Sequence, residues 1–344
     1  MLHIVLLIAC AAAIYFACEW FVNAIEWLGA RLSVGHMAVG TILAAAGTAL
    51  PETVVTLMAV LVGSPEHGDD IAVGAAMGGP LVVGTIAYAV TGAMLLVRHR
   101  KKAAISRGSG TARPSPDLRA DSEVDTGRLA HDQMWFLSIF VFKVALGLIA
   151  FAFKPWLGLA FLTAYGVYFY REMTGDGSAA TTDGLARLKL RPRSTNPGMT
   201  AIIAQTVGSL VVIFGASQLF VKQLEWAGPA LGLPAVVVAL LLSPVATELP
   251  EILNAIIWVR HGKTNLALAN ISGAMMIQAT VPSAIGIGFT PWKFDTPLVL
   301  AGLATIASIT YLLWAMKHHT FSAAKLLGAG GFYALFAIGL IVSI

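Results

Sequence analysis

The chain has 344 residues, of which 57% are apolar and only 12% are charged. Soluble globular domains carry about 25% charged residues, so this composition indicates a membrane protein. The mean hydropathy of +0.79 excludes a disordered chain and a fibrous repeat. The net charge of +4 does not indicate a nucleic-acid partner, because the basic residues are not interleaved with aromatic residues on any one segment. The two cysteines, Cys10 and Cys18, share one apolar run and form no metal-binding motif.

Ten apolar stretches are long enough to cross a lipid bilayer as helices, which takes about 20 residues each. In chain order they are 3–27, 36–62, 71–97, 133–152, 155–171, 200–222, 233–259, 266–289, 296–316 and 321–343. Two long polar connections, 98–132 and 172–198, are rich in Gly, Ser and Pro and are predicted to be poorly ordered. We therefore predict an all-α polytopic membrane protein, with a first five-helix repeat at 1–171, a linker at 172–198 and a second five-helix repeat at 199–344.

Lysine and arginine residues fall almost wholly on one side of these spans. With the N-terminus outside, 18 of the 22 basic residues lie in inside segments, three lie outside, and Lys143 lies within a span. Because basic loops stay in the cytoplasm, both termini are predicted to face outward and both long connections to be cytoplasmic. This pattern is typical of a multi-pass protein, which we expect in a prokaryotic plasma membrane. The sequence leaves the oligomeric state open, a monomer included.

The two halves of the chain carry related sequences. Segment 16–32 resembles 215–231, and GTALPE at 47–52 resembles ATELPE at 246–251, both at an offset of 199 residues. Five spans separate the two copies. Because five is an odd number, the halves must lie upside down relative to each other, which is a signature of secondary transporters.

Each copy places a glutamate after a proline in the middle of an apolar span, at Glu52 and Glu251. A lone carboxylate is costly in hydrocarbon, and proline frees backbone carbonyls one turn earlier. Freed carbonyls, the hydroxyls of Thr48 and Thr247 and the two carboxylates would form an oxygen-only site, which hard cations such as Ca²⁺ or Na⁺ prefer. The alternative is two unrelated kinks whose glutamates have structural partners.

The next span of each repeat is rich in small residues. The second copy carries Asn270, Ser272 and Gln278, whereas the first offers mainly backbone around Gly78–Pro80. These glycines either line the ion site or only allow close helix packing.

Two G-T-x-L-P-E-like motifs in a ten-span inverted repeat resemble the alpha repeats of the calcium/cation antiporter superfamily, which includes sodium/calcium and calcium/proton exchangers. The resemblance implies that Glu52 and Glu251 are the paired acidic ligands of a central ion site, and that Thr48 and Thr247 contribute oxygens there. It also implies a secondary-active antiporter of Ca²⁺ or another divalent cation against Na⁺ or H⁺, working by alternating access as the first and sixth spans slide over the core.

The chain departs from the superfamily pattern around these motifs. A serine usually precedes L-P-E, but here the two positions hold Ala49 and Glu248. Side-chain oxygens usual in the following helix are also missing, where the counterparts are Gly79, Val83, Ala274 and Gln278. Three clustered carboxylates could hold a proton, because like charges oppose full ionisation, so H⁺ is a candidate coupling ion. The predicted ion-binding residues are Glu52, Glu251, Thr48, Thr247, Glu248, Gln278 and Asn270.

Three other charged residues lie in the predicted spans or near their ends. Lys143 is either a counter-ion to Glu248 or a lysine whose ammonium reaches a polar gap. Glu26 and Glu225 stand beside tryptophans near span ends, which favours interfacial anchors. No motif indicates an enzyme or a cofactor other than the transported ions. The competing functions are a monovalent cation/proton antiporter on the same fold and a cation channel.

Overall fold

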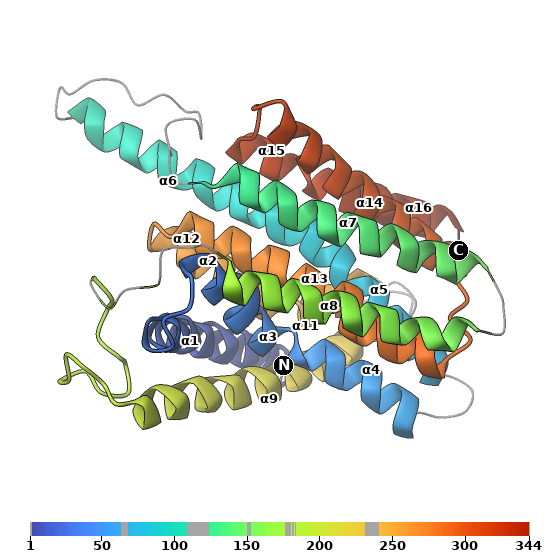
Figure 1. The fold of residues 1–344 in the computed structure, drawn as a ribbon, viewed down its shortest axis with the longest axis horizontal. Helices are drawn as coiled ribbons and strands as arrows, with labels where there is room; N and C mark the ends of the chain where they lie inside the picture. Colours follow the sequence, from blue (N-terminus) through green and yellow to red (C-terminus); the bar gives the residue numbers. More distant parts are fainter. Residues whose placement is uncertain are drawn as a thin grey trace.

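The computed structural model describes residues 2–62, 68–108, 124–149, 153–175, 180, 182, 184–230 and 241–343 (Figure 1). These residues form helices and short connections, with no β-strand among them. The helices of the first half are α1 (Leu2–Arg31), α2 (His36–Ala38), the π-helix η1 (Val39–Ala44), α3 (Ala45–Thr48), α4 (Leu50–Val62), α5 (Gly68–Val82), the π-helix η2 (Val83–Ala87), α6 (Tyr88–Gly108), α7 (Thr126–Leu148), the 3₁₀-helix η4 (Lys154–Trp156) and α8 (Leu157–Thr174).

The second half repeats this order of long and broken helices. It comprises α9 (Met199–Ala230), α11 (Ser243–Thr247), α12 (Leu249–Arg260), α13 (Thr264–Phe289), α14 (Thr296–Lys317), α15 (Ala323–Gly328) and α16 (Gly330–Ser343). In each half a long helix, α1 or α9, is followed by a segment that breaks after a threonine, between α3 and α4 or between α11 and α12.

Seven helices in the described part of the chain are long and apolar enough to cross a membrane. An eighth span results if 36–48 and 52–61, which meet at a bend of 46°, are counted together. Three predicted spans lie outside these seven. The span 36–62 is broken, and the first residues of 233–259 lie outside the described ranges. The span 155–171 corresponds to helix α8, which carries Arg171 and Glu172 in its last turn. The chain is therefore an all-helical, multi-pass membrane protein.

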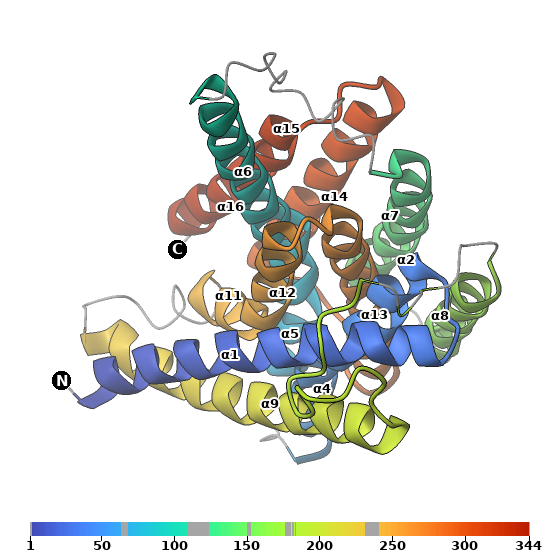
Figure 2. The same cartoon turned by 90° about the vertical axis from the view of Figure 1, so that its left-hand side faces the viewer.

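The helices differ in how deeply they are buried, with one central helix and a pair at the periphery. Helix α13 is buried along almost its whole length, whereas only 28% of the most apolar window of α1 and of α9 is buried. Figure 2 shows α1 and α9 side by side along one face of the bundle. Large apolar side chains are exposed on this pair, such as Phe16 and Val211, as expected for helices that face lipid.

The predicted polar connections are more ordered than composition indicates. Helix α6 continues to Gly108, and α7 begins at Thr126, where the Asp125 side chain accepts a hydrogen bond from the Arg128 backbone N–H at 2.9 Å. Much of the predicted loop 98–132 is thus helical. The prediction of poor order at 172–198 is wrong for the part 184–198, because Leu188 is fully buried there and backbone groups pair with side chains of α1 and α9.

Candidate ion-binding site

Two helix breaks carry the predicted acidic motifs. Helix α3 ends at Thr48 and α4 begins at Leu50, which places Glu52 in the first turn of α4. Helix α11 ends at Thr247 and α12 begins at Leu249, so Glu248 lies in the break and Glu251 in the first turn of α12. The break follows from the prolines of the two motifs, because a proline has no N–H to continue the helical hydrogen-bond ladder.

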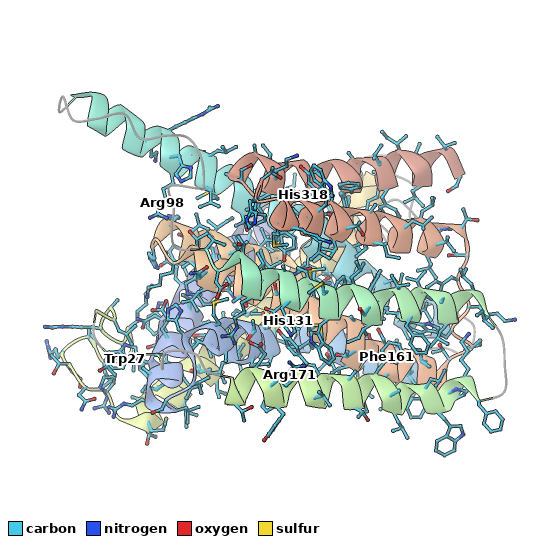
Figure 3. All side chains as sticks on the ribbon, turned by 45° about the horizontal axis from the view of Figure 1, so that its top comes forward. Trp27, Arg98, His131, Phe161, Arg171 and His318 are labelled. Carbon is cyan, nitrogen blue, oxygen red and sulfur yellow. The ribbon has the colours of Figure 1, made fainter. Side chains whose placement is uncertain are left out.

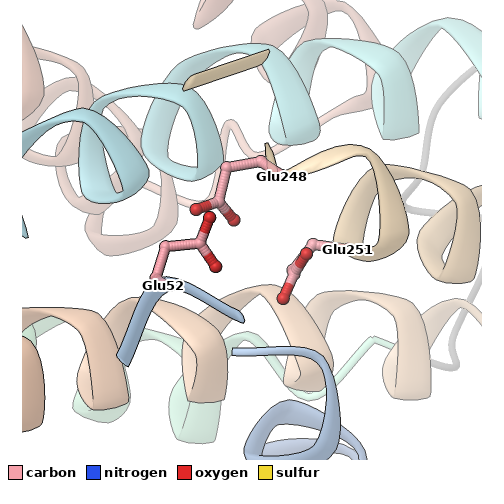
Figure 4. A group of neighbouring side chains, drawn as sticks. All are labelled: Glu52, Glu248 and Glu251. Carbon is pink, nitrogen blue, oxygen red and sulfur yellow. The ribbon is translucent and has the colours of Figure 1, made fainter. Parts of the chain in front are cut away.

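Three carboxylates converge from these breaks (Figure 4). Glu52, Glu248 and Glu251 are all buried, and each offers one oxygen within 4.8 Å of the oxygens offered by the other two. A cation at the centre of such a triangle would lie about 2.8 Å or less from each oxygen, close to the 2.3–2.6 Å of calcium–oxygen ligation. The carboxylate oxygens of Glu52 and Glu251 have no hydrogen-bond partner among the described residues.

The two predicted threonines flank this cluster in a crosswise arrangement. Thr48 lies beside the carboxylate of Glu251, and Thr247 lies beside that of Glu52. Each hydroxyl donates back to its own helix: Thr48 Oγ1 to the Ala44 carbonyl at 3.2 Å, and Thr247 Oγ1 to a carbonyl three residues earlier at 3.1 Å. Because each hydroxyl hydrogen is used in this way, the oxygen keeps lone pairs that can accept a cation.

Glu248 is held by a side chain of the central helix. Gln278 Nε2 donates to both carboxylate oxygens of Glu248, at 2.8 Å each. A β-carbon at Gly79 would lie 2.7 Å from Glu248 Oε1 and 3.1 Å from the Gln278 amide carbon. The acidic side chain thus fills the space that a side chain at position 79 would need. A side chain at position 79 would therefore displace the Glu248 carboxylate, whereas a β-carbon at Gly78 would meet only Pro244.

Asn270 is not brought to the three carboxylates. It lies eight residues before Gln278 on α13, about 12 Å along the helix axis. Its backbone N–H lies against Gly40 in η1, and both polar atoms of its buried amide lack a partner among the described residues.

Of the two interpretations of Lys143, the structure does not show the ion pair with Glu248. Lys143 is fully buried, and its Nζ donates to the Ala76 backbone carbonyl at 2.6 Å. The ammonium group also lies 5.1 Å from the centre of the Phe140 ring and 5.9 Å from that of Trp292. No carboxylate forms an ion pair with it in the described part of the chain. A carbonyl and two aromatic rings therefore surround the Lys143 amino group, in place of an acid.

Glu26 lies near the end of α1 and has defined partners there. Its buried carboxylate lies 2.5 Å from Lys263 Nζ and accepts a hydrogen bond from Trp258 Nε1 at 3.0 Å. Glu26 therefore joins α1 to the end of α12 and the start of α13. The side chain of Glu225 lies outside the described residues.

A second polar group on α7 has no counterpart in the sequence predictions. Asp132 is fully buried, and neither carboxylate oxygen has a hydrogen-bond partner among the described residues. The next residue, Gln133, donates to Tyr88 Oη at 2.6 Å and to Ser272 Oγ at 2.9 Å. The predicted span began at residue 133, so Asp132 fell in the polar connection. A helix start signal at Asp125 would have placed it inside the membrane helix.

Known proteins resemble this chain in sequence and in fold. A sequence model of the family described as sodium/calcium exchanger protein matches residues 2–173 and 201–344. Inner membrane protein YrbG of Escherichia coli (strain K12) is 22% identical over 316 residues, which cover 92% of this chain and 88% of YrbG.

Solved structures of the sodium-calcium exchanger NCX_Mj have the same fold. The form soaked with 2.5 mM Na⁺ and 0.1 mM Ca²⁺ aligns with a TM-score of 0.72 at 17% identity and covers 97% of each chain. The form soaked with 100 mM Na⁺ and 10 mM Sr²⁺ aligns with a TM-score of 0.73 at 17% identity, covering 100% of this chain and 98% of the other. The family match extends over both halves of the chain, and its only internal gap lies between α8 and the start of α9. The chain therefore belongs to the sodium/calcium exchanger family, and it is a membrane-embedded cation antiporter rather than an enzyme.

Proposed function

We propose that this protein exchanges Ca²⁺, or another hard divalent cation, for Na⁺ or H⁺ across the membrane. The ion binds among Glu52, Glu248 and Glu251, with the hydroxyl oxygens of Thr48 and Thr247 as neutral ligands. The convergence of three buried carboxylates at two helix breaks carries the proposal, because a cluster of oxygens is the ligand set that hard cations prefer.

The charge of this cluster favours antiport over a channel. No lysine or arginine forms an ion pair with the three glutamates in the described residues, and Lys143 is engaged elsewhere. Uncompensated charge is costly inside a membrane, so the cluster needs a cation or protons at every stage of transport. A site that cannot be left empty releases one ion only when another replaces it, which is the requirement for exchange.

The third carboxylate bears on the coupling ion. Glu248 stands where the superfamily usually has a serine, and the Gln278 amide is bonded to both of its oxygens. The serine hydroxyl usual at this position would serve as a neutral ligand of a separate Na⁺ site, whereas the Glu248 carboxylate can take up a proton. We therefore favour H⁺ as the coupling ion.

The mechanism we propose is alternating access on ten spans arranged as two inverted five-helix repeats, with both termini outside. Helices α1 and α9 would move together over the remaining helices. Two features support this: the helix breaks recur at matching positions in the two halves, and each threonine lies beside the glutamate of the opposite half. The basic connections and the likeness to an E. coli inner membrane protein favour a prokaryotic plasma membrane.

A monovalent cation/proton antiporter is the second candidate. Ala49 and Gly79 supply no side-chain oxygen, so fewer neutral ligands surround the cluster than a calcium ion usually takes. A smaller coordination number suits a monovalent cation that displaces protons.

Radioactive calcium uptake into proteoliposomes tests the proposal, with an outward-directed sodium gradient in one set and an outward-directed proton gradient in another, because the counter-ion must leave the vesicle as calcium enters. We expect uptake with one of the two gradients, loss of uptake in Glu52→Gln and Glu251→Gln, and retention in the matched control Glu19→Gln. Glu19 forms an ion pair with Lys189 and lies away from the cluster. Calcium uptake that survives Glu52→Gln would refute the site. Uptake of sodium but not calcium with a pH gradient would favour the second candidate.

A further inference from the structure

A cavity of about 280 Å³ opens between α7 and α8, at the start of one helix and the end of the other. Seven residues line it, including Arg128, His131 and Trp135 on α7 and Arg171 and Glu172 on α8. Figure 3 shows His131 and Arg171 at the same level of these two neighbouring helices. The cavity lies outside the carboxylate cluster and has no role in the proposed exchange.

One of the two arginines that line the cavity has a carboxylate partner among the described residues, and the other does not. Arg128 Nη2 and Glu172 Oε2 form an ion pair at 2.8 Å, and the Thr41 hydroxyl also donates to Glu172 at 2.9 Å. Arg171 has no carboxylate partner in the described part of the chain, and its guanidinium lies 5.7 Å from the centre of the Trp135 ring. The buried carboxyl of Asp132 interacts with the charges of Arg128 and Glu172. An anion with one negative charge would therefore serve as the partner of Arg171.

The histidine supplies a hydrogen-bond donor for such an anion. Trp135 Nε1 donates to His131 Nε2 at 3.0 Å, so Nε2 is the acceptor and Nδ1 carries the hydrogen of the neutral ring. The cavity thus combines a planar guanidinium with an N–H donor, the groups that bind phosphate oxygens well.

The surroundings of the cavity indicate where the anion comes from. Met134 on α7 and Phe169 and Tyr170 on α8 are exposed by 53%, 42% and 68%. Side chains of this type face acyl chains, and basic pockets between membrane helices near the membrane surface bind lipid headgroups. The carboxylate of Glu172 is already bonded to Arg128 and Thr41, so it is not free to attract a choline group.

We propose that this cavity binds the phosphate of an anionic phospholipid, with Arg171 as the charge partner and His131 as a donor. The acyl chains run along the exposed apolar faces of α7 and α8. The site prefers phosphatidylglycerol to phosphatidylcholine because only the phosphatidylglycerol headgroup carries a net negative charge to pair with Arg171.

Native mass spectrometry of the delipidated full chain tests this proposal by titration with dioleoyl-phosphatidylglycerol or dioleoyl-phosphatidylcholine. We expect tighter binding of phosphatidylglycerol and about tenfold weaker binding in Arg171→Gln, the effect of losing a hydrogen bond to a charged group. Arg171→Lys should retain part of the preference. Arg193→Gln, which removes an exposed arginine of the linker, is the matched control and should bind as the wild type does.

Three outcomes would overturn the assignment. Equal binding of the two lipids would refute the preference for an anionic headgroup. Equal binding by Arg171→Gln and Arg193→Gln would show that the cavity is not the binding site. Displacement of phosphatidylglycerol by millimolar inorganic phosphate would show a site for a free anion instead of a lipid. Because the readout is lipid binding, none of these outcomes depends on transport.

Discussion

Gly79 lies so close to Glu248 that an alanine there should weaken ion binding without harming the fold. The added methyl group would lie 2.7 Å from Glu248 Oε1, whereas ordinary contacts begin at 3.4 Å. The carboxylate must therefore withdraw by roughly 0.7 Å, since neither group can overlap the other. This shift would stretch one of its two 2.8 Å hydrogen bonds from Gln278 beyond useful length.

The expected magnitude follows from that lost bond. A hydrogen bond to a charged group contributes about 1.5 kcal/mol or more, so the concentration for half-maximal uptake in Gly79→Ala should rise about tenfold. Alanine is a better helix former than glycine, so the variant should be at least as stable as the wild type. Gly74→Ala is the matched control on the same helix, because a β-carbon at Gly74 meets nothing within 4 Å.

A double-mutant cycle separates this steric effect from any other. In Glu248→Ser the carboxylate is absent, so the alanine at position 79 should change the half-maximal concentration much less than it does in the wild type. Gradient-driven uptake in proteoliposomes gives all four values. An equal shift in both backgrounds, or no shift in Gly79→Ala, would refute the contact between position 79 and Glu248.

Three further substitutions test other buried charges. Lys154 Nζ donates to three backbone carbonyls, so Lys154→Met should lower the free energy of unfolding by about 2–4 kcal/mol, whereas the exposed control Lys293→Met should leave the thermal transition unchanged. Lys143 donates to one backbone carbonyl, and Lys143→Met should retain gradient-driven uptake. Loss of uptake in this variant would show that Lys143 takes part in ion binding. Glu26→Gln should lower the free energy of unfolding by about 1 kcal/mol, because the partly exposed ion pair with Lys263 is lost. The same substitution should have no effect on the thermal transition in a Lys263→Met background.

Much of the fold could be predicted because the membrane constrains it. Spans must be apolar over about 20 residues, so hydropathy alone locates most of the helices. Helix ends were less predictable, because polar residues extend α6 to Gly108 and start α7 at Thr126, within segments that composition assigns to a loop. Asp132 was missed for this reason. The packing of 184–198 was also invisible, since it depends on Asn23 and Gln205, which are distant in the sequence.

The two glutamates of the candidate site could be predicted because an internal repeat relates them. Glu52 and Glu251 occupy equivalent positions, and equivalent positions in inverted repeats meet near the middle of the membrane. Lys143 has no equivalent, and its distance from Glu248 along the chain gave no guide to its partner. Its carbonyl and aromatic neighbours come from three other places in the fold and become apparent only in the structure.

The two repeats share part of the candidate site and differ at Glu248 and Gly79. Both halves need a break after a threonine and a glutamate one turn later, and both have them. Only the second half has Glu248, and only the first half has a glycine where the acid needs space. Folding does not require the charge of Glu248, because glutamine would fill the same volume at less electrostatic cost. A third buried carboxylate held by a Gln278 amide has a physical reason if a cation binds there, and we therefore expect Glu248 to set the choice of ion.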